Sequence, residues 1–338
     1  MNTGTVHGIM ILDDEDVESL LDMKEVLKAV ESAFEEYARG EALMPPKLYL
    51  DLSSRLQGDF RAMPAFVNGA CGVKWVSVYP RNPSKGLRTV QASIIYSDPE
   101  TGCTLAFMDG TAITDMRTGA SGGIAAKYLA RRNSKVVGLI GGGRQSRTQL
   151  QAIREVLPAL EEVKLCEPRT ERRDAAAALA RQMAAETGLD IRDVECIEDA
   201  AEADIVVTTT PSRTPLLKDG WIRPGTHINA IGADAPGKQE LDPALLMRAK
   251  IVVDDLAQAR HSGEINVPLA RGELELDAVY GNLGSIVAGM KQGRVSDDDI
   301  TVFDSTGLAI QDMATAKIVY DKALASSRSD PKFQHLRS

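Results

Sequence analysis

Residues 135–167 read KVVGLIGGGRQSRTQLQAIREVLPALEEVKLCE. The apolar run at the start predicts a buried strand, and the stretch after the glycines has the spacing of a helix that leads to a second strand. Gly141, Gly143 and Ser146 occupy the positions of the pattern G-x-G-x-x-[GA]. In this pattern the first glycine allows a tight turn and the second lets a pyrophosphate approach the backbone at a helix N-terminus. The stretch therefore predicts a dinucleotide-binding β–α–β unit.

An acidic residue, Glu167, ends the second predicted strand, 26 positions after Gly141. A carboxylate at this place accepts hydrogen bonds from the adenosine ribose and favours NAD, although the spacing exceeds the usual value of about 20. Arg169 and Arg172 follow and could instead hold the 2′-phosphate of NADP. We therefore expect NAD and keep NADP as an alternative. A glycine-rich turn in an unrelated α/β sheet is the structural alternative to the whole motif.

Short apolar runs alternate with helical stretches from residue 135 onward, among them DIVVTTT, HINAIGA and KIVVDD. This alternation predicts an α/β fold with a doubly wound parallel sheet, a Rossmann domain over 133–308. The earlier part predicts a helix at 23–40 and a mostly antiparallel sheet with a hairpin at SDPETG, 97–102. The final helix is expected to pack back on this part. Residues 1–132 and 309–338 would thus form a separate α+β domain, for which the family resemblance given below implies substrate binding and dimerisation.

The composition of the chain limits the classes of partner that it is expected to bind. The formal net charge of −9 over 338 residues argues against nucleic acid and against an anionic membrane. No apolar run reaches the length that crosses a bilayer, and the first residues lack the basic start of a signal peptide, so a cytoplasmic protein is expected. Four histidines without helical pairing and four scattered cysteines without a CxxC pattern predict no metal site.

Lys74 is anomalous because it lies inside the strand-like run GVKWVSV, on the same face as Val76 and Val78 at period two. If that face is buried, the lysine has a lowered pKa and can transfer protons near neutral pH. If the strand lies at a sheet edge, the side chain can instead extend to water. The pattern alone leaves both interpretations open.

Three further polar residues stand where strands or helices begin or end. Asp234 follows a predicted strand in a glycine-flanked loop, where it could order a water or an amine, or form an Asx turn or cap the helix near Pro243. Arg117 precedes a small-residue stretch that permits close approach, and its guanidinium suits a carboxylate or phosphate. Ser305, in DSTG, could face a ligand or cap the last helix.

Several long runs resemble the ornithine cyclodeaminase/mu-crystallin family. They are GVKWVSVYPRNPSKGLRTVQASIIYSDPETG, MDGTAITDMRTGASGGIAAKYLA, GLIGGGRQS, GADAPGKQELD and TVFDSTGLAIQD, and they extend in order from about residue 45 to 320. Within the family, MPPKLYLD, FRAMPAF and GEINV are similar to the archaeal-type alanine dehydrogenase branch. The resemblance implies a homodimer built through the first domain and a Rossmann domain that binds NAD.

The resemblance also implies residue roles. It makes Lys74 and Asp234 catalytic, places Arg117 at both cofactor and substrate, and adds cofactor contacts across the second domain. The expected cofactor residues are Arg117, Thr118, Gly141, Gly143, Arg144, Gln145, Ser146, Glu167, Arg169, Thr209, Ala230, Ile231, Gly232, Lys238 and Ser305.

Arg61 departs from the cyclodeaminase pattern, which has an acid before the x-Met-Pro run to hold the second amine of ornithine. An arginine there repels an ammonium and attracts a carboxylate, and Lys47 adds a cation after the two prolines. The expectation is therefore oxidative deamination of L-alanine with NAD. Ornithine or lysine cyclodeamination and ketimine or opine-like reductive amination remain alternatives, as does a nicotinamide-nucleotide-dependent binding protein without turnover.

Overall fold

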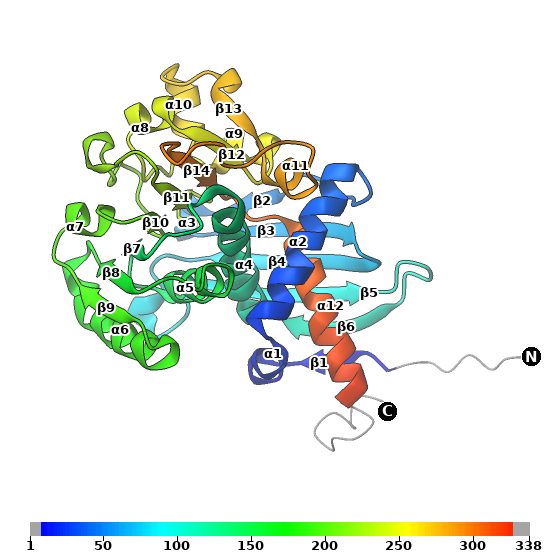
Figure 1. Ribbon diagram of the computed structural model, residues 1–338. Helices are drawn as coiled ribbons and strands as arrows, with labels where there is room; N and C mark the ends of the chain where they lie inside the picture. Colours follow the sequence, from blue (N-terminus) through cyan, green and yellow to red (C-terminus); the bar gives the residue numbers. More distant parts are fainter. Residues whose placement is uncertain (1–7, 327–338) are drawn as a thin grey trace, which may run out of the picture. The chain divides into compact units, whose positions relative to one another are not determined.

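The computed structural model describes residues 8–326, which divide into two compact units (Figure 1). Unit 1 comprises residues up to 117 together with the segment from 308, and unit 2 comprises residues 118–307. Helix α4 (Thr111–Leu129) begins in unit 1 and ends in unit 2. The first boundary between the two units thus lies inside α4, whereas the sequence predicts a domain boundary at 132/133. The small residues of α4 show no helical periodicity, so the sequence does not indicate this helix.

Unit 1 contains a six-stranded sheet with the order β1-β6-β5-β4-β3-β2. Its strands are β1 (Met10–Leu12), β2 (Leu48–Asp51), β3 (Asp59–Val67), β4 (Ala70–Val78), β5 (Val90–Ser97) and β6 (Thr104–Asp109). All neighbours pair antiparallel except β1 with β6, and the β5–β6 hairpin turns at the predicted place. The prediction of a mostly antiparallel sheet is confirmed.

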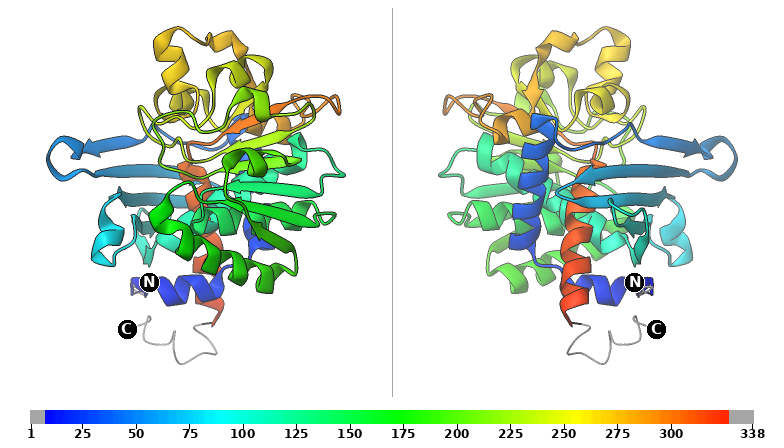
Figure 2. Two further views of the ribbon diagram at one scale, coloured as in Figure 1. Left: turned by 90° about the vertical axis from the view of Figure 1, so that its left-hand side faces the viewer. Right: turned by 90° about the vertical axis from the view of Figure 1, so that its right-hand side faces the viewer.

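Two long helices cover one face of this sheet. Helix α2 (Met23–Arg39) packs beside α12 (Ala309–Ser326), and both contact β3, as the two helices side by side in Figure 2 illustrate. The Lys322 ammonium pairs with Glu25 across the two helices. The last helix therefore does pack on the first part of the chain, as expected. The shorter elements are α1 (Asp14–Leu20), α3 (Ser53–Leu56) and the 3₁₀ turn η1 (Asn82–Lys85).

Unit 2 contains an eight-stranded sheet in which every neighbouring pair is parallel, with the order β13-β12-β14-β11-β10-β7-β8-β9. The strands are β7 (Val136–Ile140), β8 (Glu162–Cys166), β9 (Asp190–Asp193), β10 (Ile205–Thr208), β11 (His227–Ala230), β12 (Lys250–Val253), β13 (Val279–Asn282) and β14 (Thr301–Asp304). The predicted doubly wound sheet is confirmed. The strand order reverses between β7 and β10, which is where such sheets bind ligands.

Apolar side chains pack on both faces of this sheet. Val137 and Leu139 belong to one buried cluster, whereas Ile140 belongs to the other. Burial on both faces explains the continuous apolar strands. The helices are α5 (Arg144–Val156), α6 (Arg173–Thr187), α7 (Ile197–Ala201), α8 (Pro243–Arg248), α9 (Leu256–Ser262), α10 (Asn266–Arg271) and α11 (Leu283–Val287), with 3₁₀ turns η2 (Thr170–Arg172), η3 (Asp219–Trp221) and η4 (Leu276–Ala278).

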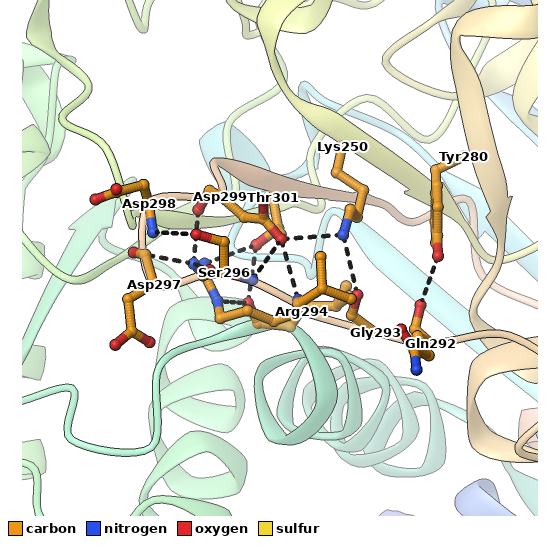
Figure 3. A network of polar contacts seen from close by, with 12 residues as sticks. Lys250, Tyr280, Gln292, Gly293, Arg294, Ser296, Asp297, Asp298, Asp299 and Thr301 are labelled. Atoms are coloured by element: carbon orange, nitrogen blue, oxygen red, sulfur yellow. Dashed lines mark hydrogen bonds and ion pairs between the residues drawn. The ribbon is translucent and has the colours of Figure 1, made fainter.

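A network of hydrogen bonds and ion pairs connects the residues at the amino ends of β12 and β14 with the segment before β14 (Figure 3). Asp299 accepts hydrogen bonds from Lys250 Nζ at 3.0 Å and from the backbone N–H of Val295 and Ser296 at 3.1 and 3.2 Å. Arg294 donates to the carbonyl of Asp299. This end of the sheet lies opposite the carboxyl ends that the cofactor motif uses, so the network serves the fold.

Candidate functional site

Lys74 lies in β4, an interior strand between β3 and β5, and its residue surface is 0% exposed. Its ammonium donates to Asp312 Oδ1 at 2.7 Å and to Thr114 Oγ1 at 3.3 Å. An edge-strand lysine that extends to water is therefore excluded. Because an unpaired buried ammonium is costly, Asp312 compensates for its burial.

The surroundings of Lys74 tune its proton affinity. Burial and the positive charge of Arg117 lower the pKa of Lys74 from 10.5 to about 7, although Asp312 raises it in part. A group with a pKa near the working pH can both accept and donate a proton. The structure thus supports the proton-transfer interpretation of this lysine.

Asp312, near the start of α12, is a residue for which the sequence analysis gave no role. Its Oδ1 accepts from Lys74 and also from Arg117 Nε at 2.9 Å, while Gln311 accepts from Arg117 Nη1 at 3.0 Å. Its Oδ2 is buried and has no hydrogen-bond partner among the described residues. A carboxylate in an otherwise apolar helix segment, LAIQD, is the signal that could have identified it.

Arg61 shares a sheet face with Lys74. In the β3–β4 register Arg61 lies opposite Val76 and Met63 lies opposite Lys74, so the two cations are diagonal neighbours. Arg61 is buried, pairs with Asp59 at 2.7 Å and lies over the ring of Tyr49. The predicted substrate residues of unit 1 are therefore brought together.

Lys47 belongs to the same group. Its charge contributes to lowering the pKa of Lys74, which places its ammonium within electrostatic reach of that lysine. With Arg61, Lys74 and Arg117, it makes up a group of four cations in unit 1, hereafter the cation cluster, of which Lys74 and Arg117 bind the Asp312 carboxylate. Such a cluster binds carboxylates, because Arg and Lys donate charge-assisted hydrogen bonds to them.

The glycine loop of unit 2 joins the end of β7 to helix α5. Gly141 has a φ of +107°, which a residue with a side chain rarely adopts, and Ser146 Oγ binds the Gly141 carbonyl and lies 2.8 Å from Thr209 Oγ1. Gly143 is the N-cap of α5, and a Cβ built on it would meet no atom within 4 Å. Arg144 and Gln145 form the first turn of this helix. The loop thus offers an open helix N-terminus to an anion.

Glu167 follows β8 and contacts this loop. Its carboxylate accepts from the Gly142 N–H at 3.0 Å and from Arg169 Nε at 2.9 Å, and its side chain is 0% exposed. Burial raises the pKa of Glu167, but the hydrogen bonds from Arg169 and Gly142 together lower it by more, so the pKa lies below its usual value. In this arrangement Glu167 fixes the glycine loop, and the side chains of Arg169 and Arg172 beside it are each 34% exposed.

The other expected cofactor residues lie mainly at the carboxyl ends of the central strands. Ala230 ends β11, and Ile231 and Gly232 follow it, while Thr209 follows β10 and Ser305 follows β14. The Ser305 N–H donates to the Ala230 carbonyl, which ties two of these ends together. All five positions therefore lie at or just after the carboxyl ends of strands in the same sheet.

Asp234 lies beyond β11, and its carboxylate pairs with Lys238 at 2.5 Å. It does not cap the following helix, because Asp242 is the N-cap of α8 and accepts from the Ala244 N–H. One structural alternative for Asp234 is thereby removed. The aspartate remains partly accessible, with 32% of its side chain exposed.

The small-residue stretch after Arg117 has a structural explanation. A Cβ on Gly123 would lie 2.8 Å from Ala152 Cβ, so α4 needs glycines to approach α5. The Thr118 carbonyl accepts from Gln149 Nε2 at 2.8 Å, which fastens the same two helices. Within unit 2, the small residues of this stretch therefore allow the close approach of helix α5.

These residues fit a dinucleotide. The open space at Gly143 and the uncapped start of α5 suit a pyrophosphate, and the switch between β7 and β10 lies beside them. Over residues 8–326, no group of three or more His, Cys, Asp and Glu side chains is arranged to hold a metal ion. Within the same range, no helix combines the length and the apolar character that a membrane crossing requires.

The sequence profile of the ornithine cyclodeaminase/mu-crystallin family matches residues 8–327. The chain belongs to this family. Among its relatives, alanine dehydrogenase of Archaeoglobus fulgidus is 52% identical over 318 residues, which cover 94% of this chain and 96% of the relative.

Solved structures of relatives agree with this fold over 94% of the chain. An archaeal alanine dehydrogenase dimer with bound NAD superposes with a TM-score of 0.90 at 52% identity, covering 94% of this chain and 97% of the other. The Δ¹-pyrroline-2-carboxylate reductase of Thermococcus litoralis, in complex with NADH and L-proline, also gives 0.90, at 41% identity with coverages of 94% and 98%. The family fold is thus established, while the relatives differ in the substrates that their names state.

Proposed function

We propose that this family member catalyses the reversible NAD-dependent oxidative deamination of a small L-amino acid, with L-alanine as the substrate. The observation that carries the proposal is the cation cluster of unit 1, in which a buried lysine of lowered pKa adjoins arginines that suit a carboxylate. The 52% identity with an alanine dehydrogenase supports the choice of alanine.

Carboxylate binding is the first task of the site. Lys47, Arg61 and Arg117 are proposed to hold the substrate carboxylate, and so to fix the position of its Cα. Orientation of this kind can lower a barrier by several kcal/mol. The aliphatic part of the substrate then has little room for a second charge, since a δ-ammonium would meet Arg61.

Proton transfer is the second task, and Lys74 is proposed to perform it. The overall conversion takes L-alanine, NAD⁺ and water to pyruvate, ammonium, NADH and a proton. Removal of hydride from Cα leaves an imine on the substrate, and water adds to its carbon. Lys74 accepts a proton during this addition and returns one as ammonia leaves. For Asp234 we propose the orientation of the amine and the water, a role supported by its partial exposure and its place after β11.

The cofactor is proposed to be NAD. The residues that would hold it are those of the glycine loop and the strand ends around Thr209, Gly232 and Ser305. When bound, NAD⁺ accepts the hydride that leaves the substrate. Glu167 is buried and pairs with Arg169, so its charge is largely compensated, and NADP stays a second cofactor. The choice of NAD is supported by the relatives solved with NAD or NADH.

Reduction of a cyclic imino acid is a second candidate. The relative solved with NADH and L-proline is 41% identical over nearly the whole chain, and a proline carboxylate would suit the same cations. This activity needs the same cofactor and no second amine, so Arg61 does not argue against it.

The experiment that separates these functions uses purified protein with NAD⁺ and, in turn, L-alanine, L-ornithine and L-lysine, and with NADH and Δ¹-pyrroline-2-carboxylate. We expect net NADH with alanine. Proline formed from ornithine without net NADH would show a cyclodeaminase, because that reaction recycles its hydride. NADH oxidation by the cyclic imine alone would show a reductase, and tight cofactor binding without turnover would show a binding protein.

A homodimer through unit 1 completes the proposal. Ile11, Phe107 and Ile95 are partners in the register across β1, β6 and β5, and they are 66, 42 and 37% exposed. Trp75 on the same face is 43% exposed. An apolar row of this kind on a sheet face marks an interaction surface, and a family member has been solved as a dimer.

A further inference from the structure

Three buried carboxylates at the carboxyl edge of the unit 2 sheet are not used by the mechanism above. Asp304, Glu264 and Glu240 are each 0% exposed, and within residues 8–326 none of them forms an ion pair. Burying a carboxylate without a cation is costly, and each is compensated instead by hydrogen bonds from backbone N–H groups or hydroxyls. Burial raises the pKa of all three.

The three carboxylates are linked in series through the backbone. Asp304, the last residue of β14, accepts from the Glu264 N–H at 2.8 Å and from the Ile265 N–H at 3.2 Å. Glu264 in turn accepts from the Glu240 N–H at 3.0 Å and from the Leu241 N–H at 2.7 Å. Each carboxylate thus holds the main chain of the residue that carries the next one.

Glu240 ends the series at two strand ends. Its Oε1 accepts from the Thr210 N–H and the Thr210 hydroxyl, both at 2.7 Å. Its Oε2 accepts from the Thr208 hydroxyl and from the Gly232 N–H, both at 2.8 Å. Thr209 lies between two of these donors, and Asp234 follows Gly232 by two residues. A shift of Glu240 would therefore move the loops after β10 and β11 together.

The segment after β14 is fixed beside this series. Asp254, which follows β12, accepts from the Thr306 N–H at 2.6 Å and from the Gly307 N–H at 2.7 Å. Ser305 lies between Asp304 and Thr306, so both of its neighbours take part in buried hydrogen bonds. The ends of β10, β11 and β14 are thus held by acids that lie behind them.

We propose that Asp304, Glu264 and Glu240 act as one carboxylate relay, whose members are positioning residues that hold the loops after β10 and β11 in the geometry that binds NAD. The inference rests on the proposed function, because those loops are assigned to the cofactor there. The relay acts through the bonds of Glu240 to Thr208, Thr210 and Gly232, and the first two of these residues flank Thr209.

The test compares Glu240→Gln with a matched control, Asp299→Asn. Asp299 also accepts two backbone N–H groups, but at the amino ends of the strands (Figure 3). The dissociation constant of NAD is measured by calorimetry and the melting temperature by calorimetric scanning. An amide at Glu240 sets an NH₂ group against donors, so NAD affinity should fall about tenfold to a hundredfold. The Asp299 variant should lose thermal stability with NAD affinity within twofold of wild type.

Equal loss of melting temperature in both variants, with NAD affinity unchanged in both, would overturn the relay while leaving the proposed function intact. A wild-type protein that does not bind NAD would overturn the proposed function and the relay with it. Should Glu240→Gln not fold, Thr210→Val replaces it, since this change removes one hydroxyl donor to Glu240 without touching the acid.

The series arrangement has its own test. Glu264→Ala removes the acceptor for the Glu240 N–H, and the double variant Glu240→Gln/Glu264→Ala completes a cycle. A relay predicts that the double variant binds NAD no more weakly than the worse single variant. Losses of affinity that multiply would show that Glu240 and Glu264 act independently and would contradict the series.

Discussion

The Lys74 ammonium lies 2.7 Å from Asp312 Oδ1, although 238 positions separate the two residues in the chain. The pair is almost fully buried, and Arg117 binds the same oxygen. Asp312 therefore holds two of the four members of the cation cluster. Its second oxygen is buried and has no hydrogen-bond partner among the described residues.

The pH dependence of activity should follow Lys74. Its pKa is lowered to about 7, so kcat/KM for oxidative deamination should rise with pH to about 7 and then level off, since a base must be neutral. The free energy of unfolding should rise as well between about pH 7 and 10.5, because in that range the unfolded lysine binds a proton that the folded one has lost. Lys74→Met should reduce kcat by about a hundredfold or more and abolish this limb of the profile. If Lys74→Met leaves the pH profile of kcat/KM unchanged, Lys74 is not the group that transfers the proton.

Asp312→Asn should shift the same limb to lower pH, because the carboxylate raises the pKa of Lys74 and its removal lowers it. The variant should also unfold at a lower temperature, since a buried ion pair has lost one partner. Asp321→Asn is the control, as Asp321 lies in the same helix and forms an exposed pair with Lys317. Coincident pH profiles for wild type and Asp312→Asn would show that the aspartate serves the fold alone.

Arg61→Glu should abolish alanine oxidation by raising KM, because a carboxylate would then face the substrate carboxylate. The melting temperature should fall as well, because the buried Arg61 pairs with Asp59, so circular dichroism and NAD affinity are used to establish that the variant is folded. Arg55→Glu in the exposed helix α3 applies the same charge change away from the cluster. Unchanged kinetics for Arg61→Glu would remove this arginine from the site.

Gly143→Val should separate cofactor binding from stability. A Cβ on Gly143 meets no atom within 4 Å, so the melting temperature should stay near that of wild type. The added side chain would occupy the place of the pyrophosphate, so NAD affinity should fall by a factor of about a hundred or more. Gly220→Val, at another open glycine, controls for the substitution itself. Full NAD affinity in Gly143→Val would contradict the assignment of the loop.

Ile95→Lys combined with Phe107→Lys should convert the proposed dimer to a monomer, because two like charges on register partners cannot neutralise each other. Both residues lie on the exposed face of the unit 1 sheet, and burying their charges against a second copy would be costly. Light scattering after size exclusion reports the mass. A double variant with the same mass as wild type would place the interface elsewhere.

Periodicity and turn chemistry were enough to predict the parallel sheet, the hairpin at 97–102 and helix α2. The same reasoning missed helix α4 because this helix is buried on nearly every side, so no polar stripe alternates with an apolar one at helical spacing. The sequence predicts no role for Asp312 because a sequence does not show whether a carboxylate contacts water or a buried lysine.

The sequence alone determined the alternation of strands and helices in the second half of the chain, the glycine loop and the family resemblance, since these depend on local spacing and on long matching runs. The tertiary structure decided what each polar residue faces. It placed Lys74 in an interior strand beside Asp312, turned Glu167 toward the glycine loop, and set Glu240, Glu264 and Asp304 in series. The physical reason is that burial and hydrogen-bond partners, which fix the pKa and the role of an ionisable group, come from segments far apart in the chain.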